Sequence, residues 1–475
     1  MTSWLAEVAS LLDVSSVFLF LITLVVFSIP VLIIFPPIPV ERSDALGQTH
    51  SKIGVPPQES NLRDQWTAAA RAATTTNGHA NGRAGSSGRP SPPKIHSLHI
   101  YPLKSCQGIE LAEATVLPTS LEHDRVFCLA QLKTRKPRTD PAEAAAAAAA
   151  SNKQVDYWEV LTLRQIASMA NIKVDLWVPD ASKHSRQLGP MTGEDGSGAS
   201  ESFVVVRFPW RSPGAWGLVE TMAAKLSRGL SAAPEREFML PMSFPSAHEV
   251  KARGYSHAEV THFRNVIPSL NMGPELPKEL ALYLGLEPAR LGLFRLDPAQ
   301  RRQVLGCAPT REVAGYQPEI DFQDAYPLHL LNLSSVRALE SKIRRDADID
   351  RLDARRFRPN IIVSGLPEYD EDDWRSVQFK AVSRQDADSL FDVSCRTVRC
   401  KLPNVDPATG IRHKVEPDYA LRHYREIDAG APKKGCMGMQ MCPLFSPDVA
   451  SHNLKSRIRV GMEISVLKRG AHHAL

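Results

Sequence analysis

The second half of the chain is dominated by short strand-like runs, and one of them ends at a cysteine beside a tight turn. Such runs are separated by turn residues and occur at 361–363, 377–382, 391–402 and 463–467. Short runs of β-branched and aromatic residues between glycines and prolines predict strands. The run at 391–402 contains Arg399-Cys400 and precedes the turn Asp-Pro-Ala-Thr-Gly at 406–410. This pattern predicts a β-rich α+β fold in which a β-barrel carries flanking helices.

Cys400 is the first candidate functional residue, because a thiol at a strand end is both held in place and accessible. A thiolate is a soft, strongly donating ligand that suits a redox-active metal. Cys395 competes for this role, although it lies on the opposite side of an ideal strand. A buried, inert thiol is the alternative for both positions. The chain has seven cysteines and no Cys-x-x-Cys pair, so we expect neither a zinc ribbon nor a disulfide framework, and a reducing compartment is favoured.

The amino-terminal region contains an apolar run, Val14 to Ile38, without a charged residue. A transmembrane helix needs roughly 20 apolar residues, and this run is long enough. A cleaved signal peptide is the alternative, but Glu7 and Asp13 precede the run, where a signal peptide is basic. We therefore expect residues 1–38 to form a single membrane anchor. Basic residues follow it, which places the body of the protein in the cytosol by the positive-inside rule.

Composition divides the rest of the chain into a linker and two domains. Residues 39–93 are rich in Pro, Ser, Gly, Asn and Thr and lack apolar periodicity, which predicts a disordered tether. We place the first domain at 94–320 and the second at 321–470. An alanine-rich run near 142–150 and a loop-like stretch at 189–202 are expected to be insertions.

Local patterns predict further elements within these domains. Strands are expected at 95–102 and 203–208, and a helix with a proline start and a glycine stop at 277–285. Most of 212–300 is expected to be helical or irregular. A second helix is expected to begin near Asp324, because several apolar residues fall on one helical face: Leu328, Leu331, Val336, Leu339 and Ile343.

Several common functional classes are excluded by the sequence. The net charge of +5 is small for 475 residues and does not point to nucleic acid. The chain has no Gly-x-Gly-x-x-Gly after a strand and no Walker-type phosphate loop. It also lacks the His-Glu-x-x-His and Gly-x-Ser-x-Gly signatures. A self-contained dehydrogenase, an ATPase, a common zinc protease and an α/β-hydrolase are therefore not expected.

Polar side chains instead follow several predicted strands. Lys104 and Ser105 come after the first strand, and an ammonium and a hydroxyl in such a loop can bind an anionic oxygen. Arg125 precedes another apolar strand, and Arg358 and Asn360 precede a third. Arg358 can bind phosphate with both arms of its guanidinium, and Asn360 offers a donor and an acceptor. The alternative for each arginine is an exposed ion pair.

The order of these motifs resembles that of MOSC-domain proteins. The motifs are Tyr-Pro-Leu-Lys-Ser-Cys at 101–106, Asp-Arg at 124–125, Leu-Arg-Gln at 163–165, Arg-Phe-Arg-Pro-Asn at 356–360, and Arg-Cys at 399–400 with the Asp-Pro-x-Thr-Gly turn. The chain is similar to the membrane-anchored branch of mitochondrial amidoxime-reducing components over about 94–470. The resemblance implies a MOSC N-terminal β-barrel-like domain followed by a MOSC β-barrel domain.

The resemblance also implies a molybdopterin-type molybdenum cofactor with a protein cysteine as metal ligand. That cysteine precedes the same turn, so the role falls to Cys400. The residues implied to bind the cofactor are Lys104, Ser105, Arg125, Tyr326, Arg358, Asn360, Val398 and Arg399. Tyr326 replaces the small hydroxyl residues found there in the animal branch. Arg164 is implied to lie at the substrate mouth and to take part in catalysis.

The implied activity is two-electron reduction of an N-hydroxylated group, such as an amidoxime. No flavin or nicotinamide motif is present, so electrons must come from partners, and the resemblance implies a cytochrome b5 and its NADH-dependent reductase. It also implies the mitochondrial outer membrane. A cofactor-binding or sulfur-carrier module is the alternative, as is a tethered scaffold without chemistry. The Met- and Cys-rich stretch 435–442 is expected to be a loop that lines or covers the site, with a copper site as the alternative.

Overall fold

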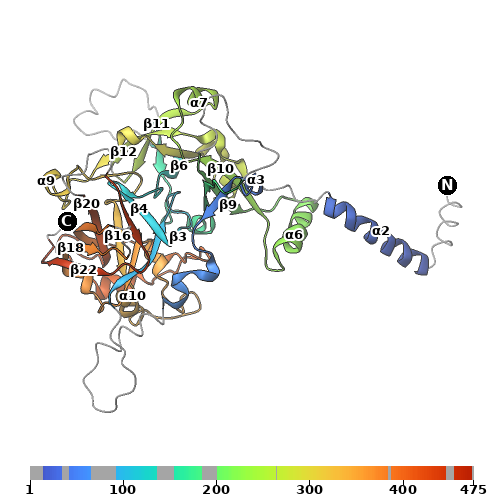
Figure 1. Ribbon diagram of the computed structural model, residues 1–475. Coiled ribbons are helices and arrows are strands. Elements are labelled where there is room, and N and C mark those ends of the chain that lie inside the picture. The colour runs from blue at the N-terminus through green and yellow to red at the C-terminus, as the bar shows by residue number, and fades with distance from the viewer. Residues whose placement is uncertain are drawn as a thin grey trace, which may run out of the picture. The chain divides into compact units, whose positions relative to one another are not determined.

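The computed structural model describes residues 14–34, 42–65, 92–135, 155–183, 201–263, 265–382, 387–445 and 454–472. Two compact units are distinguished along the chain (Figure 1). The smaller unit comprises Met1–Leu46 and Pro209–Arg236, and the larger one comprises Gly47–Phe208 and Glu237–Leu475. The predicted alanine-rich insertion and most of the second insertion lie outside the described residues.

The smaller unit is mostly helical where the structure describes it. Its helices are α2 (Val14–Ile34), α3 (Arg42–Leu46) and α6 (Ala215–Arg228). Helix α2 coincides with most of the apolar run and has no charged residue in its first or last turn. The side chains at both of its ends lie outside the described residues, and within the described ranges no helix is long and apolar enough to cross a bilayer. The predicted transmembrane anchor is therefore not supported.

The largest element of the fold is an eight-stranded sheet. Along the sheet the order is β22 (Ile464–Arg469), β18 (Trp374–Phe379), β19 (Ser389–Val398), β20 (Cys436–Leu444), β16 (Leu328–Asn332), β17 (Ile361–Ser364), β2 (Lys94–Ile100) and β3 (Ile109–Leu111). Strands β16 and β17 are parallel, whereas each of the other neighbouring pairs is antiparallel. The sheet thus joins the start of the first predicted domain to the second one.

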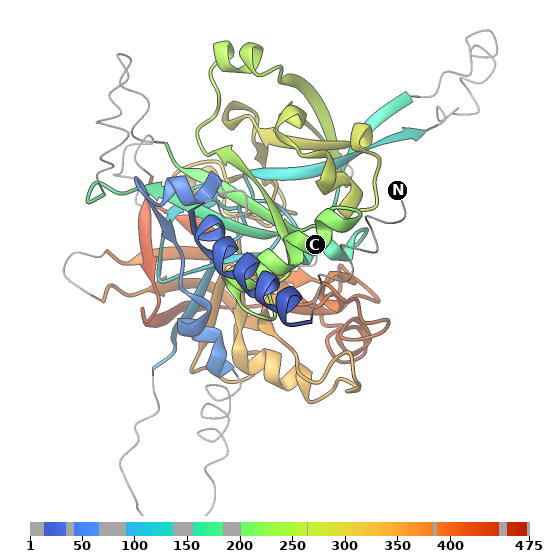
Figure 2. The ribbon, with the colours of Figure 1, turned by 90° about the vertical axis from the view of Figure 1, so that its right-hand side faces the viewer.

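Helices cover one side of this sheet. Helix α10 (Leu333–Glu340) contacts β16 and β17, and α11 (Asp418–Tyr424) contacts β20 and α10. Figures 1 and 2 both show α10 below the strands. A buried cluster that includes Val336, Leu339 and Ile362 fills the interface. Apolar side chains from helix and sheet therefore pack into one core, as burial of a hydrophobic helix face requires.

A closed five-stranded barrel forms the second β-structure. Its strands are β11 (Ser256–His262), β12 (Asn265–Asn271), β13 (Leu291–Leu296), β6 (Phe127–Arg135) and β7 (Val155–Val160). The barrel closes where β11 pairs in parallel with β7. Cys128, Val260, Phe294 and Phe322 are buried together in one apolar cluster of the barrel. Closure removes the exposed strand edges that an open sheet would leave.

Smaller sheets and helices complete the fold. A four-stranded sheet consists of β1 (His50–Ile53), β8 (Lys173–Pro179), β9 (Phe203–Pro209) and β10 (Glu235–Pro241). A three-stranded sheet consists of β21 (Ser456–Arg459), β4 (Glu113–Leu117) and β5 (Ser120–Leu121). Strands β14 (Arg302–Gln303) and β15 (Glu319–Ile320) form a two-stranded sheet. Within the described ranges, the remaining α-helices are α7 (Ala247–Ala252), α8 (Lys278–Tyr283) and α9 (Arg311–Ala314). Strand β9 and helix α8 confirm the elements predicted at 203–208 and 277–285.

The predicted tether at 39–93 is wrong for its first part. Strand β1 pairs with β8 in an antiparallel register from His50 to Ile53, and Leu62 is buried in the core beneath α10. Residues 66–91 lie outside the described residues. Composition alone missed the ordered part because four paired residues and one buried leucine are too short a signal against a polar background.

Two further secondary-structure predictions are corrected. Leu328 and Leu331 lie in strand β16, and the helix begins only at Leu333, because a strand buried on both faces has a continuous apolar run that can imitate a helical face. Most of 212–300 is helical or irregular, as predicted, although this range also contains strands β10 to β13. The Met- and Cys-rich stretch is β20, a central strand rather than a loop.

Candidate cofactor site

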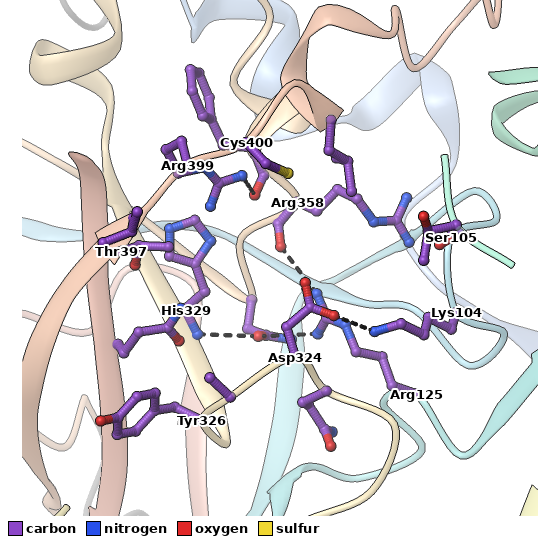
Figure 3. A pocket seen from close by; sticks show the side chains of 18 of the residues that line it. Lys104, Ser105, Arg125, Asp324, Tyr326, His329, Arg358, Thr397, Arg399 and Cys400 are labelled. Atoms are coloured by element: carbon purple, nitrogen blue, oxygen red, sulfur yellow. Dashed lines mark hydrogen bonds and ion pairs between the residues drawn. The ribbon is translucent and has the colours of Figure 1, made fainter. Parts of the chain in front are cut away.

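A cavity of about 240 Å³ lies where the loop after β2, the segment before β16, the turn before β17 and the end of β19 come together. Every residue proposed for the site from the sequence lines it: Lys104, Ser105, Arg125, Arg164, Tyr326, Arg358, Asn360, Val398, Arg399 and Cys400. Figure 3 shows most of them around one space. Their functional roles stay predictions, but the geometry places them in one site.

Lys104 and Ser105 occupy the turn that follows β2. Ser105 adopts a left-handed backbone conformation, with φ of 68°, and both residues are almost fully buried. The Lys104 ammonium donates to the Phe322 carbonyl oxygen at 2.6 Å and pairs with the carboxylate of Asp324. Burial lowers the pKa of Lys104, and Asp324 opposes that shift without cancelling it. The turn therefore holds an ammonium at the cavity in an environment that favours anionic ligands.

Arg125 and Arg358 reach the cavity from two separate loops and converge on Tyr101. Their guanidinium carbons lie 4.7 Å and 4.1 Å from the Tyr101 ring centroid, within the range of cation–π contacts. Arg125 also donates to the Arg358 carbonyl oxygen at 3.2 Å and to Asn360 Oδ1 at 3.3 Å. Both arginines have left-handed backbones, with φ of 55° and 52°. Packing and hydrogen bonds thus fix the orientation of two adjacent cations.

Arg358 retains an unused donor. Its Nη1 donates to the Cys106 carbonyl oxygen at 2.8 Å, but its Nη2 is buried and has no hydrogen-bond partner within the described ranges. Burial lowers the pKa of Arg358 to about 10, and the neighbouring Arg125 acts in the same direction. A buried, unpaired guanidinium nitrogen is costly, and an anionic ligand in the cavity would remove that cost.

Asn360 connects these arginines to the sheet. Its Oδ1 accepts from the backbone N–H of His329 at 3.2 Å, and its Nδ2 donates to the His99 carbonyl oxygen at 3.2 Å. Because the amide is used on both sides, it acts chiefly as a connector in this structure. His329 also lines the cavity and was not predicted from the sequence. Burial and Arg399 hold the pKa of His329 well below its ordinary value, so it presents a neutral imidazole.

Val398, Arg399 and Cys400 form the end of β19 and the residues just after it. The Arg399 side chain donates to the Phe357 carbonyl oxygen at 2.8 Å. Its Nε and Thr397 Oγ1 are buried without a partner among the residues described. Cys400 is partly exposed, unlike the buried Cys395. Figure 3 shows its sulfur facing the space between Arg399 and Arg358.

The turn after Cys400 is held by an arginine of the Arg-Phe-Arg-Pro-Asn motif. Asp406 accepts the backbone N–H groups of Ala408 and Thr409 at 2.8 Å and 3.1 Å, which is the hydrogen-bonding of an Asp-initiated turn. Arg356 is buried and donates to the other Asp406 oxygen at 2.6 Å. The motif therefore has two roles: Arg356 supports the cysteine loop, and Arg358 faces the cavity.

Cys395 and Tyr326 also line the cavity, but both belong to a buried cluster of the fold. Cys395 is buried in a cluster with Tyr326, Val304 and Cys442, and burial raises its pKa to about 12. A thiol that stays protonated and apolar is a poor metal ligand. The Tyr326 hydroxyl donates to the Gly306 carbonyl oxygen at 2.6 Å. The hydroxyl contact expected of Tyr326 from the sequence is thus already occupied within the protein.

Arg164 and Asp324 also line the cavity, and the buried His262 contacts Asp324. The Arg164 guanidinium lies 4.5 Å from the ring of Phe263, which is half exposed at the β11–β12 turn. Asp324 and His262 were missed as site residues because their sequence context is unremarkable. His262 is buried with its Nε2 3.3 Å from Asp324 Oδ1, and burial, followed by Lys104, lowers its pKa to about 4.

The donor set is suited to a cofactor that brings its own metal ligands. Among the described residues, no group of three or more His, Cys, Asp or Glu side chains could hold a metal ion. The accessible Cys400 thiol shares the cavity with the cations Lys104, Arg125, Arg358 and Arg399. The unpaired donors of Arg358, Arg399 and Thr397 add hydrogen-bonding capacity. These features fit a polyanionic organic group that carries a soft metal.

Comparisons with protein families agree with this arrangement. A model described as the MOSC domain matches residues 317–465, and one described as the MOSC N-terminal beta barrel domain matches residues 93–198. The chain belongs to the MOSC-domain proteins. The two matched regions contribute Lys104, Arg125 and Arg164 from one domain and Arg358 and Cys400 from the other.

Curated relatives refine the comparison. The chain is 28% identical over 244 residues to the mitochondrial amidoxime-reducing component 1 of Mus musculus, covering 50% of this chain and 62% of that protein. It is 27% identical over 213 residues to the human mitochondrial amidoxime-reducing component 1. That match covers 43% of this chain and 54% of the human protein. It is 27% identical over 230 residues to the mitochondrial amidoxime reducing component 2 of Rattus norvegicus. That match covers 48% of this chain and 60% of the rat protein. The matches thus span about half to three fifths of these relatives.

Proposed function

We propose that this protein is a molybdenum-cofactor oxidoreductase that reduces N-hydroxylated compounds of the amidoxime type. Its relatives are named for amidoxime reduction, and the MOSC domain covers the cysteine and its turn. The observation that carries the proposal is the position of Cys400, a partly exposed thiol in a cavity rich in cations. A cysteine thiolate is a strong soft-metal ligand.

The protein side chains supply binding and orientation. Lys104, Arg125 and Arg358 would hold an anionic pterin phosphate, with Arg399 beside the metal-binding thiol, and Cys400 would hold the metal. When bound, such a cofactor supplies the two-electron redox chemistry that amino acid side chains lack. Arg164 and Phe263 would face the substrate at the rim. Reduction of an amidoxime to an amidine consumes two electrons and two protons and releases water.

Electrons would come from a protein partner, because the motifs of nicotinamide and flavin binding are absent from the sequence. We propose a cytochrome b5 and its NADH-dependent reductase as donors, on the strength of the family resemblance. A mitochondrial location, at the outer membrane, belongs to the same proposal. It is supported by the names of the relatives, and fractionation of cells expressing the chain with and without 14–34 tests it.

Replacement of the two candidate cysteines tests the central assignment. We expect Cys400→Ala to lose bound molybdenum and to reduce amidoxime turnover at least about 100-fold, because removal of a metal ligand weakens both binding and chemistry. Cys395→Ala is the matched control, five residues earlier within β19, and should keep both. The measurements are elemental analysis and benzamidoxime reduction with added cytochrome b5 and reductase. Molybdenum retained at the wild-type level in Cys400→Ala would disprove the assignment.

The same two measurements separate the alternative functions. Molybdenum without turnover in the wild-type chain would favour a cofactor-binding or sulfur-carrier module. Absence of both would favour a scaffold, although that alternative leaves the buried, unpaired donors of Arg358 and Arg399 within the described cavity unexplained. Turnover with molybdenum supports the reductase.

A further inference from the structure

Helix α6 (Ala215–Arg228) exposes a continuous apolar face that the reductase proposal does not use (Figure 1). Leu218, Met222 and Leu226 are spaced by four residues and are 57%, 65% and 85% exposed. Residues at i, i+4 and i+8 lie in one row along a helix. Trp216 is 61% exposed, and Val219, which is 38% exposed, lies between it and this row around the helix. Isolated exposed leucines are ordinary, but an aligned apolar row indicates an interaction surface.

The opposite side of α6 already has its packing partners. Gly217, Ala223 and Ala224 are buried. Glu220 accepts from the Ser212 backbone N–H and from the Ser212 hydroxyl, both at 2.8 Å. The exposed row is therefore a second face of a helix whose first face is packed, and it is not a consequence of an unpacked helix.

The charges beside the exposed row are predominantly positive. Residues 209–236 have a net charge of +2, from four basic residues (Arg211, Lys225, Arg228 and Arg236) and two acidic ones (Glu220 and Glu235). Arg228 forms an ion pair with Glu235. Lys225 and Arg228 lie in the last turn of α6, and Trp216 lies in its first turn. An apolar helical face with tryptophan at one end and basic residues along its border is characteristic of helices that lie in a membrane interface. The positive charges favour anionic lipid headgroups.

The size of the face argues against a folded protein as its partner. A helix of 14 residues is about 21 Å long, so its apolar row offers only a fraction of the roughly 800 Å² that each partner buries in a stable protein interface. A lipid surface needs no matching groove. It can also be shared with a neighbouring element, because α2, in the same compact unit, exposes Phe18, Leu19, Phe20 and Phe27.

We propose that α6 is an interfacial lipid-binding helix that inserts its Trp216–Leu226 face into an anionic membrane surface. It would lie in the plane of the bilayer, with the Leu218, Met222 and Leu226 side chains among the acyl chains and Lys225 and Arg228 at the headgroups. This contact would hold the protein against the membrane that carries its electron donors, which raises their effective concentration. Lipid binding does not depend on the cofactor or on turnover.

Hydrogen exchange of the full-length protein tests the proposal. Vesicles of phosphatidylcholine with phosphatidylserine are added, and exchange of the α6 backbone amides is followed by mass spectrometry. We expect these amides to exchange at least about tenfold more slowly with the vesicles, since lipid burial suppresses local opening, and the effect should weaken in high salt. Vesicles of phosphatidylcholine alone should protect less.

Two adjacent substitutions provide the matched comparison. Leu226→Glu adds one negative charge to the apolar row, whereas Ser227→Glu adds the same charge next to it on the exposed polar side. We expect Leu226→Glu to abolish the protection of α6 and Ser227→Glu to retain most of it. Circular dichroism checks that both variants remain folded. Benzamidoxime reduction in detergent should be equal in the two variants, which keeps this test independent of the reductase proposal.

Three outcomes would overturn the proposal. Equal protection in Leu226→Glu and Ser227→Glu, or no protection with either kind of vesicle, would show that the apolar row does not bind lipid. Protection without vesicles that rises with protein concentration would show instead that the row joins two copies of the chain.

Discussion

At the scale of single residues, the site depends on backbone conformations that are uncommon for these residue types and that the sequence does not predict. Ser105, Arg125 and Arg358 all have positive φ values, between 52° and 68°. Left-handed conformations cost non-glycine residues roughly 1–2 kcal/mol each. Three such residues at one cavity indicate that contacts elsewhere in the fold offset this backbone strain. The strained conformations orient a hydroxyl and two guanidinium groups for ligand binding.

Arg358 offers the sharpest test at this scale. Arg358→Gln removes a charged donor from the cavity, and we expect about 10- to 100-fold weaker cofactor retention, the equivalent of about 1.5–3 kcal/mol for a charged hydrogen bond. Arg358→Lys should be intermediate, because it keeps the charge but loses the planar fork over Tyr101. Retention is measured as molybdenum content after dialysis.

Arg355→Gln is the control for this series. Arg355 is exposed three residues earlier, and its side chain pairs with Asp353 rather than with the cavity. We expect its molybdenum content to match the wild type. Equal loss of metal in Arg355→Gln and Arg358→Gln would mean that general damage to the turn, and not the cavity-facing donor, causes the effect.

At the scale of elements, β20 shows how a misread sequence feature becomes understandable in the structure. Its cysteines and methionines looked like soft ligands, but Cys436, Met439, Met441 and Cys442 are all fully buried in the middle of the large sheet. Methionine fills irregular space between sheet and helices. The strand also supports the site, since Gly438 lies against the backbone of β16 and the ring of His329.

Gly438→Ala tests this close approach. A Cβ at residue 438 would collide with the Leu330 carbonyl oxygen and with His329 Nε2, and its φ of 76° adds strain. We expect a loss of about 2–4 kcal/mol in the free energy of unfolding, from strain of about 1 kcal/mol and an overpacking cost of about 1–3 kcal/mol. Urea denaturation measures it.

Gly461→Ala separates the two contributions. Gly461 has a φ of 93°, but no neighbouring atom lies within 4 Å of the point that an alanine Cβ would occupy, so only the backbone strain remains. A loss of about 1 kcal/mol is expected. If the two variants lost the same free energy, the contact between β20 and β16 would not be as close as the structure indicates.

At the scale of the whole molecule, the cavity is assembled from residues far apart in the chain, from Lys104 to Cys400. The segment between α2 and the first domain also joins the body. Glu110 of β3 accepts from Ser60 Oγ at 2.6 Å and from the Asn61 N–H at 2.9 Å, and Leu62 enters the core that contains Phe357. The residues before the first matched domain therefore contribute to the fold.

Leu62→Ala tests that contribution. Removal of a buried leucine side chain is expected to lower the free energy of unfolding by about 2–4 kcal/mol, from lost burial and an unfilled cavity. Arg63→Ala is the adjacent, exposed control and should change it by less than about 0.5 kcal/mol. A small effect of Leu62→Ala in thermal or urea denaturation would instead support the prediction that this segment is a tether.

The sequence by itself determined the strand-rich class, the order of the motifs and the identity of most residues that are proposed to bind the cofactor. These are carried by local patterns and by short spacings such as Arg-x-Asn and Cys before Asp-Pro-x-Thr-Gly. The tertiary structure alone decided which cysteine is accessible, that Tyr326 is engaged elsewhere, that Arg356 supports a turn, and that His262, Asp324 and His329 belong to the site. Burial and hydrogen-bond partners depend on contacts between segments that are distant in the chain. A local sequence pattern therefore cannot predict them.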